Sequence, residues 1–175
     1  MVVLGTPSML CDMPFVSLHF CGTVVAESRA VKNLGVYVDR HLNYETHIDN
    51  VTRKCTGILI ALTHARHVIP RVTLKRIVEA LVLSVLRYCL SVHGSCGMTQ
   101  LRRTQKLVNF CVRVVTSKRR YDHVSQSLEQ LQWLTAEQLV RYHTVCAAER
   151  IIVSGQPESI RATTPFCILN RHLVI

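Results

Sequence analysis

The sequence predicts an α+β fold in which short N-terminal β-strands, including a hairpin, precede a mainly α-helical bundle. Residues 15–26 alternate apolar and polar side chains around Cys21-Gly22, which is typical of a hairpin with a two-residue turn. From residue 43 the apolar spacing lengthens from two residues to about 3.5, which indicates helices. Residues 70–121 then hold two helical runs with most of the apolar pattern. At 175 residues and 49% hydrophobic composition, the chain is one globular domain or a piece of one.

The N-terminal third is predicted to consist of short strands. In the hairpin, Val16, Leu18 and Phe20 alternate along one strand, so we expect them to share the face that packs on the core. Gly22 suits the turn because a tight hairpin turn needs positive φ. The predicted strands are residues 1–4, 15–20, 23–26 and 34–38, the last followed by Asp39.

Helical periodicity begins near Asn43 and ends ahead of Pro70, which suits the first turn of the next helix because its missing N–H has no partner there. That next helix is predicted to be buried over much of its girth, since Leu83 and Leu90 fall outside its main apolar stripe. A loop at 93–97 separates it from a third helix. The three apolar stripes are Ile48, Val51, Cys55, Ile58, Leu59 and Leu62; Ile77, Val78, Leu81, Val82, Val85, Leu86 and Cys89; and Leu101, Val108, Cys111, Val112 and Val115.

The last two predicted helices come after the basic cluster, and the first of them starts at Tyr121-Asp122. A short one extends to Gln132, and Trp133 is interpreted as a core anchor where two helices meet. Thr135 and Gln138 have the spacing of a capping box, so we expect Thr135 to cap the final helix. That helix is predicted to reach about Ser154, before a glycine and a proline.

The formal net charge of +10 is concentrated in the middle of the chain. Residues 50–121 hold fourteen Lys and Arg against Glu79 alone, whereas residues 1–49 and 122–175 each hold more acidic than basic residues. Arginine outnumbers lysine sixteen to five, and the guanidinium group suits phosphate better than a soluble surface requires. The middle of the chain is therefore expected to attract polyanions, with nucleic acid the usual one.

Eight cysteines occur without a C-x-x-C pair, which indicates a reduced protein with no disulfide framework. The N-terminus has no basic segment followed by a long apolar one, so we expect no signal peptide. Glu79 and Arg87 interrupt the longest apolar run, so no membrane span is expected. These features predict an intracellular protein that is not secreted, with the nucleus as one candidate compartment.

No catalytic constellation is evident in the sequence. Two-metal phosphoryl chemistry needs carboxylates that converge on both ions, and the four aspartates are scattered and never paired. His64 and His67, and His93 with Cys96, have half of a zinc-site spacing, but no second pair completes it. Ordinary histidines are therefore favoured over a metal site, and no cofactor is expected in this chain. The aspartates are Asp12, Asp39, Asp49 and Asp122.

A basic patch at the third helix makes the better case for function. Arg102, Lys106 and Arg113 share one helical face, and the cluster after the helix extends the patch. Contact with a nucleic-acid backbone is favoured over a merely solvated face, and Tyr121 could stack on a base or sugar. The candidate nucleic-acid-binding residues are Arg102, Arg103, Lys106, Arg113, Lys118, Arg119, Arg120 and Tyr121.

Four stretches share motifs, in order and spacing, with one known family. They are VKNLGVYVD and LNYETHI within residues 31–48, RYC at 87–89, LRRTQKLVN at 101–109 with Arg113, and LQWL at 131–134. These resemble the V-K-x-L-G-V, L-x-F/Y-x-x-H-I, D-Y-C, L-x-x-L-Q-x-x-Q-N and L-x-W-L-P motifs of non-LTR (LINE-type) retrotransposon reverse transcriptases. The resemblance covers roughly residues 1–155. The chain differs from the family motifs at three of these positions: Arg87 stands where the family has an acidic residue, Thr104 where it has an apolar one and Thr135 where it has proline.

The resemblance implies a part of an RNA-directed DNA polymerase C-terminal to its catalytic palm. In that family the palm and its metal-binding aspartates lie upstream, so this chain alone is expected to be inactive, although the parent enzymes use Mg²⁺. Phe20, Cys21 and Gly22 would correspond to the primer grip. The implied domains are 1–42, a β-hairpin segment at the end of the palm; 43–155, a helical thumb-like region that holds the primer–template duplex; and 156–175, an irregular tail.

Two alternatives stay open at this point. The chain could be a stand-alone basic helical module that binds nucleic acid or an acidic protein partner, or an enzyme whose site the sequence does not reveal. Partners on the first interpretation are an RNA–DNA or DNA duplex backbone and the rest of the reverse transcriptase, and no membrane is involved.

Overall fold

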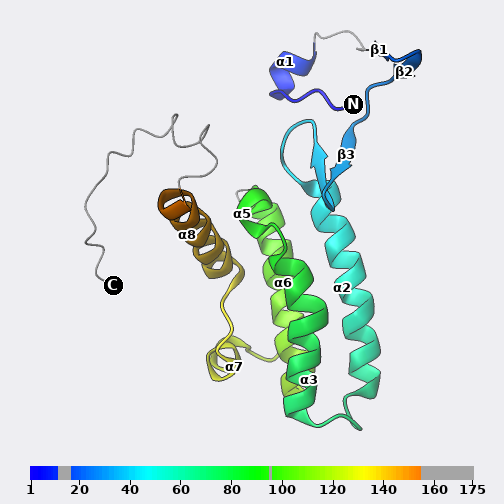
Figure 1. Cartoon of the computed structure of the whole chain (residues 1–175). Coiled ribbons are helices and arrows are strands. Elements are labelled where there is room, and N and C mark those ends of the chain that lie inside the picture. The colour runs from blue at the N-terminus through cyan, green and yellow to red at the C-terminus, as the bar shows by residue number, and fades with distance from the viewer. Residues whose placement is uncertain (12–16, 95, 155–175) are drawn as a thin grey trace.

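Two antiparallel hairpins precede a set of helices, so the predicted α+β class is confirmed (Figure 1). The computed structural model describes residues 1–11, 17–94 and 96–154. The N-terminal elements are α1 (Pro7–Cys11), β1 (Leu18–Phe20), β2 (Thr23–Val25), β3 (Ala30–Asn33) and β4 (Val36–Asp39). The later ones are α2 (Glu45–Ala65), α3 (Arg71–Val78), the π-helix η1 (Glu79–Leu83), α4 (Ser84–Arg87), α5 (Leu90–His93), α6 (Met98–Thr116), α7 (Ser125–Leu131) and α8 (Ala136–Ser154).

Both hairpins turn through two residues with positive φ. Cys21 and Gly22 join β1 to β2 as predicted, with φ of 48° and 75°. Leu34 and Gly35 join β3 to β4 with φ of 46° and 88°, so the predicted strand 34–38 was wrong at its start: these residues form a second turn. Leucine seldom adopts positive φ, and here its side chain is 84% exposed, free of any packing demand.

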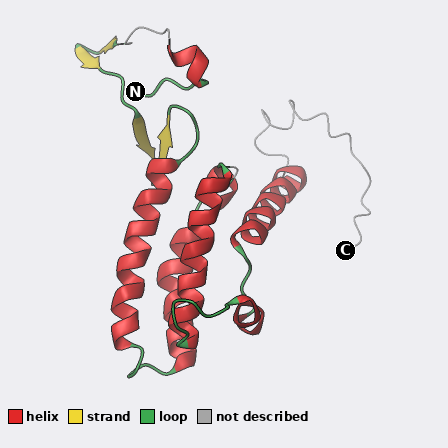
Figure 2. Cartoon of the chain, turned by 180° about the vertical axis from the view of Figure 1, so that it is seen from behind, coloured by secondary structure: helices red, strands yellow, loops and turns green. Residues whose placement is uncertain are grey.

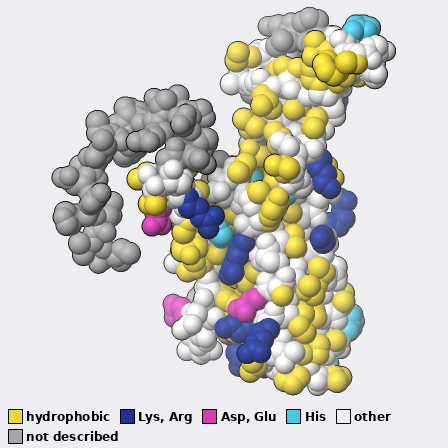
Figure 3. All heavy atoms as spheres, in the orientation of Figure 1, with side chains coloured by type: hydrophobic (Ala, Val, Ile, Leu, Met, Phe, Trp, Pro, Cys, Tyr) yellow, Lys and Arg dark blue, Asp and Glu magenta, His cyan; other side chains and the backbone are white. Residues whose placement is uncertain are grey.

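Two further strand predictions were wrong. Residues 1–4 form no strand, because their backbone makes isolated bonds such as Ser28 N–H to the Met1 carbonyl rather than a ladder. Leu18 and Phe20 do not face a core: they are 53% and 72% exposed, since the β1–β2 sheet has no layer packed on it among the described residues. Val16 lies outside the described residues. Hydrophobic side chains accordingly show on the surface of this part of the molecule (Figure 3).

The helices α2, α3 to α4, and α6 lie side by side along one axis and enclose the core (Figures 1 and 2). The predicted α2 stripe is confirmed, with Ile48, Cys55 and Leu59 buried. Burial raises the pKa of the Cys111 thiol on α6 to about 12, so this cysteine is a small hydrophobic residue in the core. The core residues that α6 contributes are Leu107, Val108, Cys111, Val112, Val114 and Val115.

The second predicted helix is interrupted twice. The π-turn at η1 inserts one residue into the helical register, so Leu83 is buried while Leu81, expected on the apolar stripe, is 49% exposed. Tyr88 is extended and Cys89 has φ of 53°, which ends α4 and starts α5. His93, expected in a loop, is therefore the last residue of the short helix α5, where its side chain is buried.

The C-terminal helices pack on α5 and α6, with α7 near one end of the bundle (Figure 2). The capping box is confirmed: the Thr135 N–H donates to Gln138 Oε1 at 2.9 Å, and the Gln138 N–H donates to Thr135 Oγ1 at 3.3 Å. Trp133 is a core anchor as expected, 6% exposed, and its Nε1–H donates to Glu79 Oε1 at 2.8 Å. Tyr121 does not start a helix, because α7 begins at Ser125.

Candidate nucleic-acid interface

The predicted basic residues lie on α6 and on the loop that follows it. Arg102 and Lys106 are exposed on α6, as are Arg119, Arg120 and Tyr121 in the loop. Their position follows from the packing of α6, since its valines face the core and its cations occupy the opposite side. The three others, Arg103, Arg113 and Lys118, are half-buried.

The loop from Ser117 to Val124 is ordered by its own hydrogen bonds. Ser117 ends α6 with φ of 56°, and the Lys118 N–H returns to the Arg113 carbonyl at 3.1 Å. The Lys118 ammonium donates to the His123 carbonyl at 2.7 Å, and the Arg119 N–H donates to Asp122 Oδ2 at 2.8 Å. These bonds hold the loop beside the end of α6.

Tyr121 is the exposed tip of this loop, with 88% of its side chain accessible. The Arg120 guanidinium lies 5.9 Å from the centre of its ring, within the range of a cation–π contact. An exposed aromatic ring beside cations is the arrangement that stacks on a base or sugar.

The structure also forms a groove between α2 and α6 that the sequence does not reveal. Two hollows, of about 290 and 380 Å³, share Phe110 as a common wall, and we call the pair the α2–α6 groove. No carboxylate lines it among the described residues. Its lining is Thr52, Thr56, Arg103, Lys106, Leu107 and Phe110 in one hollow, and Thr63, Arg66, Phe110, Arg113, Val114, Lys118 and Arg120 in the other.

Arg66 is a functional candidate that the sequence analysis missed. It follows α2 and lies far from the predicted patch in sequence, but it lines the same hollow as Arg113. The Nε atoms of both arginines are buried and have no hydrogen-bond partner within the described chain. Only the pairing of α2 with α6 brings these two side chains together, so periodicity along a single helix could not have found them.

Three predicted residues are partly engaged by the fold. Arg103 forms an ion pair with Asp49 of α2, which offsets its charge and ties the two helices together. One Arg113 nitrogen donates to the Asp122 carbonyl at 3.5 Å, and the Lys118 ammonium donates to the His123 carbonyl at 2.7 Å. The remaining cations of the α2–α6 groove are therefore Arg66, Lys106 and Arg120, of which Lys106 and Arg120 are exposed.

The predicted primer-grip residues are not brought to this groove. Phe20, Cys21 and Gly22 are all exposed at the β1–β2 turn, which lies beyond the hairpin end of the bundle, whereas the loop after α6 lies towards the end that carries α7 (Figure 1). The structure thus separates the two predicted sets of site residues.

The histidines form no metal site in the described part of the chain, where no three His, Cys, Asp or Glu side chains converge. His64 and His67 are exposed. His93 instead packs on His47, with ring centroids 4.7 Å apart. Burial, and secondly the charge of His93, lowers the pKa of His47 to about 4, and burial also lowers the pKa of His93. No helix in the described ranges is long and apolar enough to cross a membrane.

Comparison of the chain with protein-family models, with curated proteins and with solved structures finds no match. The resemblance to non-LTR reverse transcriptases therefore stays a prediction from the sequence motifs.

Proposed function

We propose that the chain binds the sugar–phosphate backbone of a nucleic-acid duplex along the α2–α6 groove. The observation that carries this proposal is the chemistry of the groove: it is lined by six cations and no carboxylate among the described residues. The role is the one implied by the motif resemblance, that of the non-catalytic part of a retrotransposon reverse transcriptase that holds the primer–template duplex.

The unpartnered donors favour phosphate over solvent. A buried N–H group without an acceptor costs about 1–3 kcal/mol, and both Arg66 and Arg113 leave such a group in one hollow. A phosphate oxygen satisfies a guanidinium donor directly, often through two parallel bonds. The neighbouring threonines of the other hollow, Thr52 and Thr56, supply neutral hydroxyl groups of the kind that also contact phosphates, whereas the Thr63 hydroxyl already donates to the Leu59 carbonyl at 2.7 Å.

The length of the groove also suits a duplex strand. Arg103 and Arg113 are ten residues apart on α6, which corresponds to about 15 Å along the helix axis. One strand of a duplex presents about four phosphates over that distance. Arg103, Lys106 and Arg113 lie within this length, and the other three cations line the hollow at the Arg113 end, which is sufficient for several backbone contacts that do not read sequence.

The test is the affinity of purified chain for a fluorescent RNA–DNA hybrid, measured by anisotropy on two unrelated sequences. A groove variant, Arg66→Gln with Lys106→Gln and Arg120→Gln, should bind both hybrids about a hundredfold more weakly at 0.1 M salt, because about three counterion-releasing contacts are lost.

The matched control removes the same charge elsewhere. Arg71→Gln with Arg76→Gln and Arg150→Gln neutralises three exposed arginines of α3 and α8, and it should retain most of the affinity. Equal losses in both variants would show that net charge, and not the groove, attracts the hybrid. If the unmutated chain does not bind the hybrid but binds polyglutamate, the alternative of an acidic protein partner replaces this proposal.

A further inference from the structure

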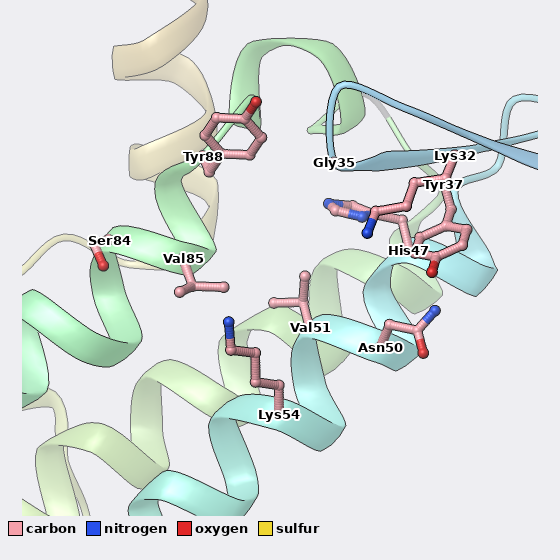
Figure 4. Close-up of a pocket in the computed structure, with 10 residues that line it drawn as sticks. All are labelled: Lys32, Gly35, Tyr37, His47, Asn50, Val51, Lys54, Ser84, Val85 and Tyr88. Atoms are coloured by element: carbon pink, nitrogen blue, oxygen red, sulfur yellow. The ribbon is translucent and has the colours of Figure 1, made fainter.

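A third hollow, of about 440 Å³, is drawn in Figure 4. By helical spacing, its α2 residues Asn50, Val51 and Lys54 lie on the face of α2 opposite to the threonines of the α2–α6 groove. The hollow is formed by α2, by the helix from η1 to α4, and by the β3–β4 hairpin, and we call it the hairpin pocket. Its volume falls within the range of about 300–1,000 Å³ typical of small-molecule sites. Its lining is Lys32, Gly35, Tyr37, His47, Asn50, Val51, Lys54, Ser84, Val85 and Tyr88.

The charge of the hairpin pocket is entirely positive. Lys32 from β3 and Lys54 from α2 extend into it from different sides, and no carboxylate is part of its lining (Figure 4). Neither lysine forms an ion pair with any residue that the structure describes; Lys32 lies 5.7 Å from the centre of the Tyr37 ring. Two uncompensated ammonium groups around one hollow form a receptor for a multiply charged anion.

Neutral polar groups of the hairpin pocket also lack partners. The Asn50 amide and the Tyr37 hydroxyl form no hydrogen bond with the described residues, so both remain available as donors. His47 is only 4% exposed, yet its Nε2 atom has no partner in the described chain. Besides its lysines, the hairpin pocket therefore offers the Asn50 amide and the Tyr37 hydroxyl as neutral donors to a polar ligand.

Part of the lining of the hairpin pocket is apolar, and a hydrogen bond fixes its position. Val51 of α2 and Val85 of α4 face each other across the pocket, and the Tyr88 ring lies on the α4 side (Figure 4). The Tyr88 hydroxyl donates to the Leu34 carbonyl at 2.7 Å, which ties the hairpin turn to the helix. Gly35 is favoured in this turn by its φ of 88°, and an added Cβ would make only an ordinary contact with the Tyr88 ring, at 3.5 Å.

We propose that the hairpin pocket binds the phosphomonoester group of a nucleotide. The dianionic phosphate lies between Lys32 and Lys54, with Asn50 as a neutral donor. The sugar and base lie against the apolar side chain of Val51 and the Tyr88 ring, and the ring packs on the flat face of the base. This ligand could be a free mononucleotide or the phosphorylated 5′ end of a strand, because both present the same group.

The test is titration of the ¹⁵N-labelled full chain with adenosine 5′-monophosphate, with adenosine as the ligand that lacks the phosphate. We expect saturable shifts of the Lys32, Asn50 and Lys54 amides with the nucleotide and none with adenosine. Lys32→Gln and Lys54→Gln should each weaken binding about tenfold, as expected for the loss of a charge-assisted contact. Both lysines are exposed, so unchanged thermal unfolding should show that the variants fold.

Two further arms complete the design. Lys106→Gln should retain nucleotide binding but weaken hybrid binding. Lys54→Gln should weaken nucleotide binding but retain hybrid binding. The two proposed sites can therefore be confirmed or rejected independently. A 5′-phosphorylated trinucleotide that competes with the nucleotide better than its 5′-hydroxyl form would identify a strand end as the ligand; weaker competition would identify the free nucleotide. The proposal is overturned if adenosine binds as tightly as its phosphate, or if both lysine variants bind like the parent.

Discussion

The helical bundle and the N-terminal hairpin segment differ in how much apolar surface they bury. In residues 45–154 the helices bury a continuous apolar core, with Leu59, Val78 and Val112 fully enclosed. In residues 1–44 each sheet has only two strands, and the side chains of β1 and β2 face solvent on both sides. An isolated two-stranded hairpin is at best marginally stable, so the N-terminal segment depends on the bundle for its position.

A few polar bonds provide that attachment. Asp39, at the end of β4, accepts hydrogen bonds from the N–H groups of His41 and Asn43 and so shapes the entry to α2. The hydroxyl of Tyr88, which follows α4, donates a hydrogen bond to the Leu34 carbonyl in the β3–β4 turn. The bundle therefore supplies the stability, and the α2–α6 groove and the hairpin pocket lie on opposite sides of α2.

The largest expected effect comes from deleting a core side chain in the bundle. Leu59→Ala should lower the free energy of unfolding by about 2–5 kcal/mol, because the side chain is fully buried and leaves a cavity. Leu18→Ala in the hairpin should change it by less than about 0.5 kcal/mol, since that leucine is 53% exposed. Urea denaturation measures both, and similar losses would refute the contrast between the two regions.

A second effect lies where the two regions meet. His47, in the first turn of α2, is buried against His93 of α5, with the Tyr44 ring also near His93, and it lines the hairpin pocket together with Lys32 and Lys54. The folded pKa of His47 is about 4, below its usual 6.5, so the unfolded chain binds more protons between these values. Stability is therefore complete above about pH 6.5 and is lost as the pH falls towards 4, by up to about 3 kcal/mol.

Urea denaturation from pH 7.5 to 4.5 checks this dependence. His47→Gln should flatten the acid side of the stability profile, whereas His64→Gln, which alters an exposed histidine of α2, should leave the profile unchanged. Parallel profiles for the parent and both variants would mean that His47 does not contribute to the acid sensitivity.

The smallest of these effects concerns the cap of α8. Thr135→Ala removes the hydroxyl that accepts the Gln138 N–H, and it should cost about 0.5–2 kcal/mol. Thr144→Ala, at an exposed position within the same helix, is the control and should cost nothing. An unchanged denaturation midpoint for Thr135→Ala would mean that the capping box contributes no stability.

Sequence periodicity predicted the elements whose signals are local. The α2 stripe and the capping box of α8 were predicted and confirmed, because both depend on residues about one helical turn apart. The second hairpin was missed because its turn places a leucine at positive φ, where glycine or asparagine is the usual signal. The break at Tyr88 and Cys89 was missed for the same reason, since no glycine or proline marks it.

The candidate sites were only partly predictable. Lys106 and Arg113 share a face of one helix and were found from spacing alone. Arg66 joins them only through the packing of α2 on α6, and Lys32 meets Lys54 only because the β3–β4 hairpin folds back beside α2. Contacts between elements depend on tertiary packing, which spacing along one element does not encode.

The salt dependence of hybrid binding tests the central claim most directly. For the parent, log K should fall linearly with log salt, with a slope of about −0.9 for each phosphate contact. The groove variant at Arg66, Lys106 and Arg120 should flatten that slope by about three units on every sequence, whereas the control variant at Arg71, Arg76 and Arg150 should keep the parental slope. Identical slopes for the two variants would contradict the assignment of the α2–α6 groove as the binding site of the duplex.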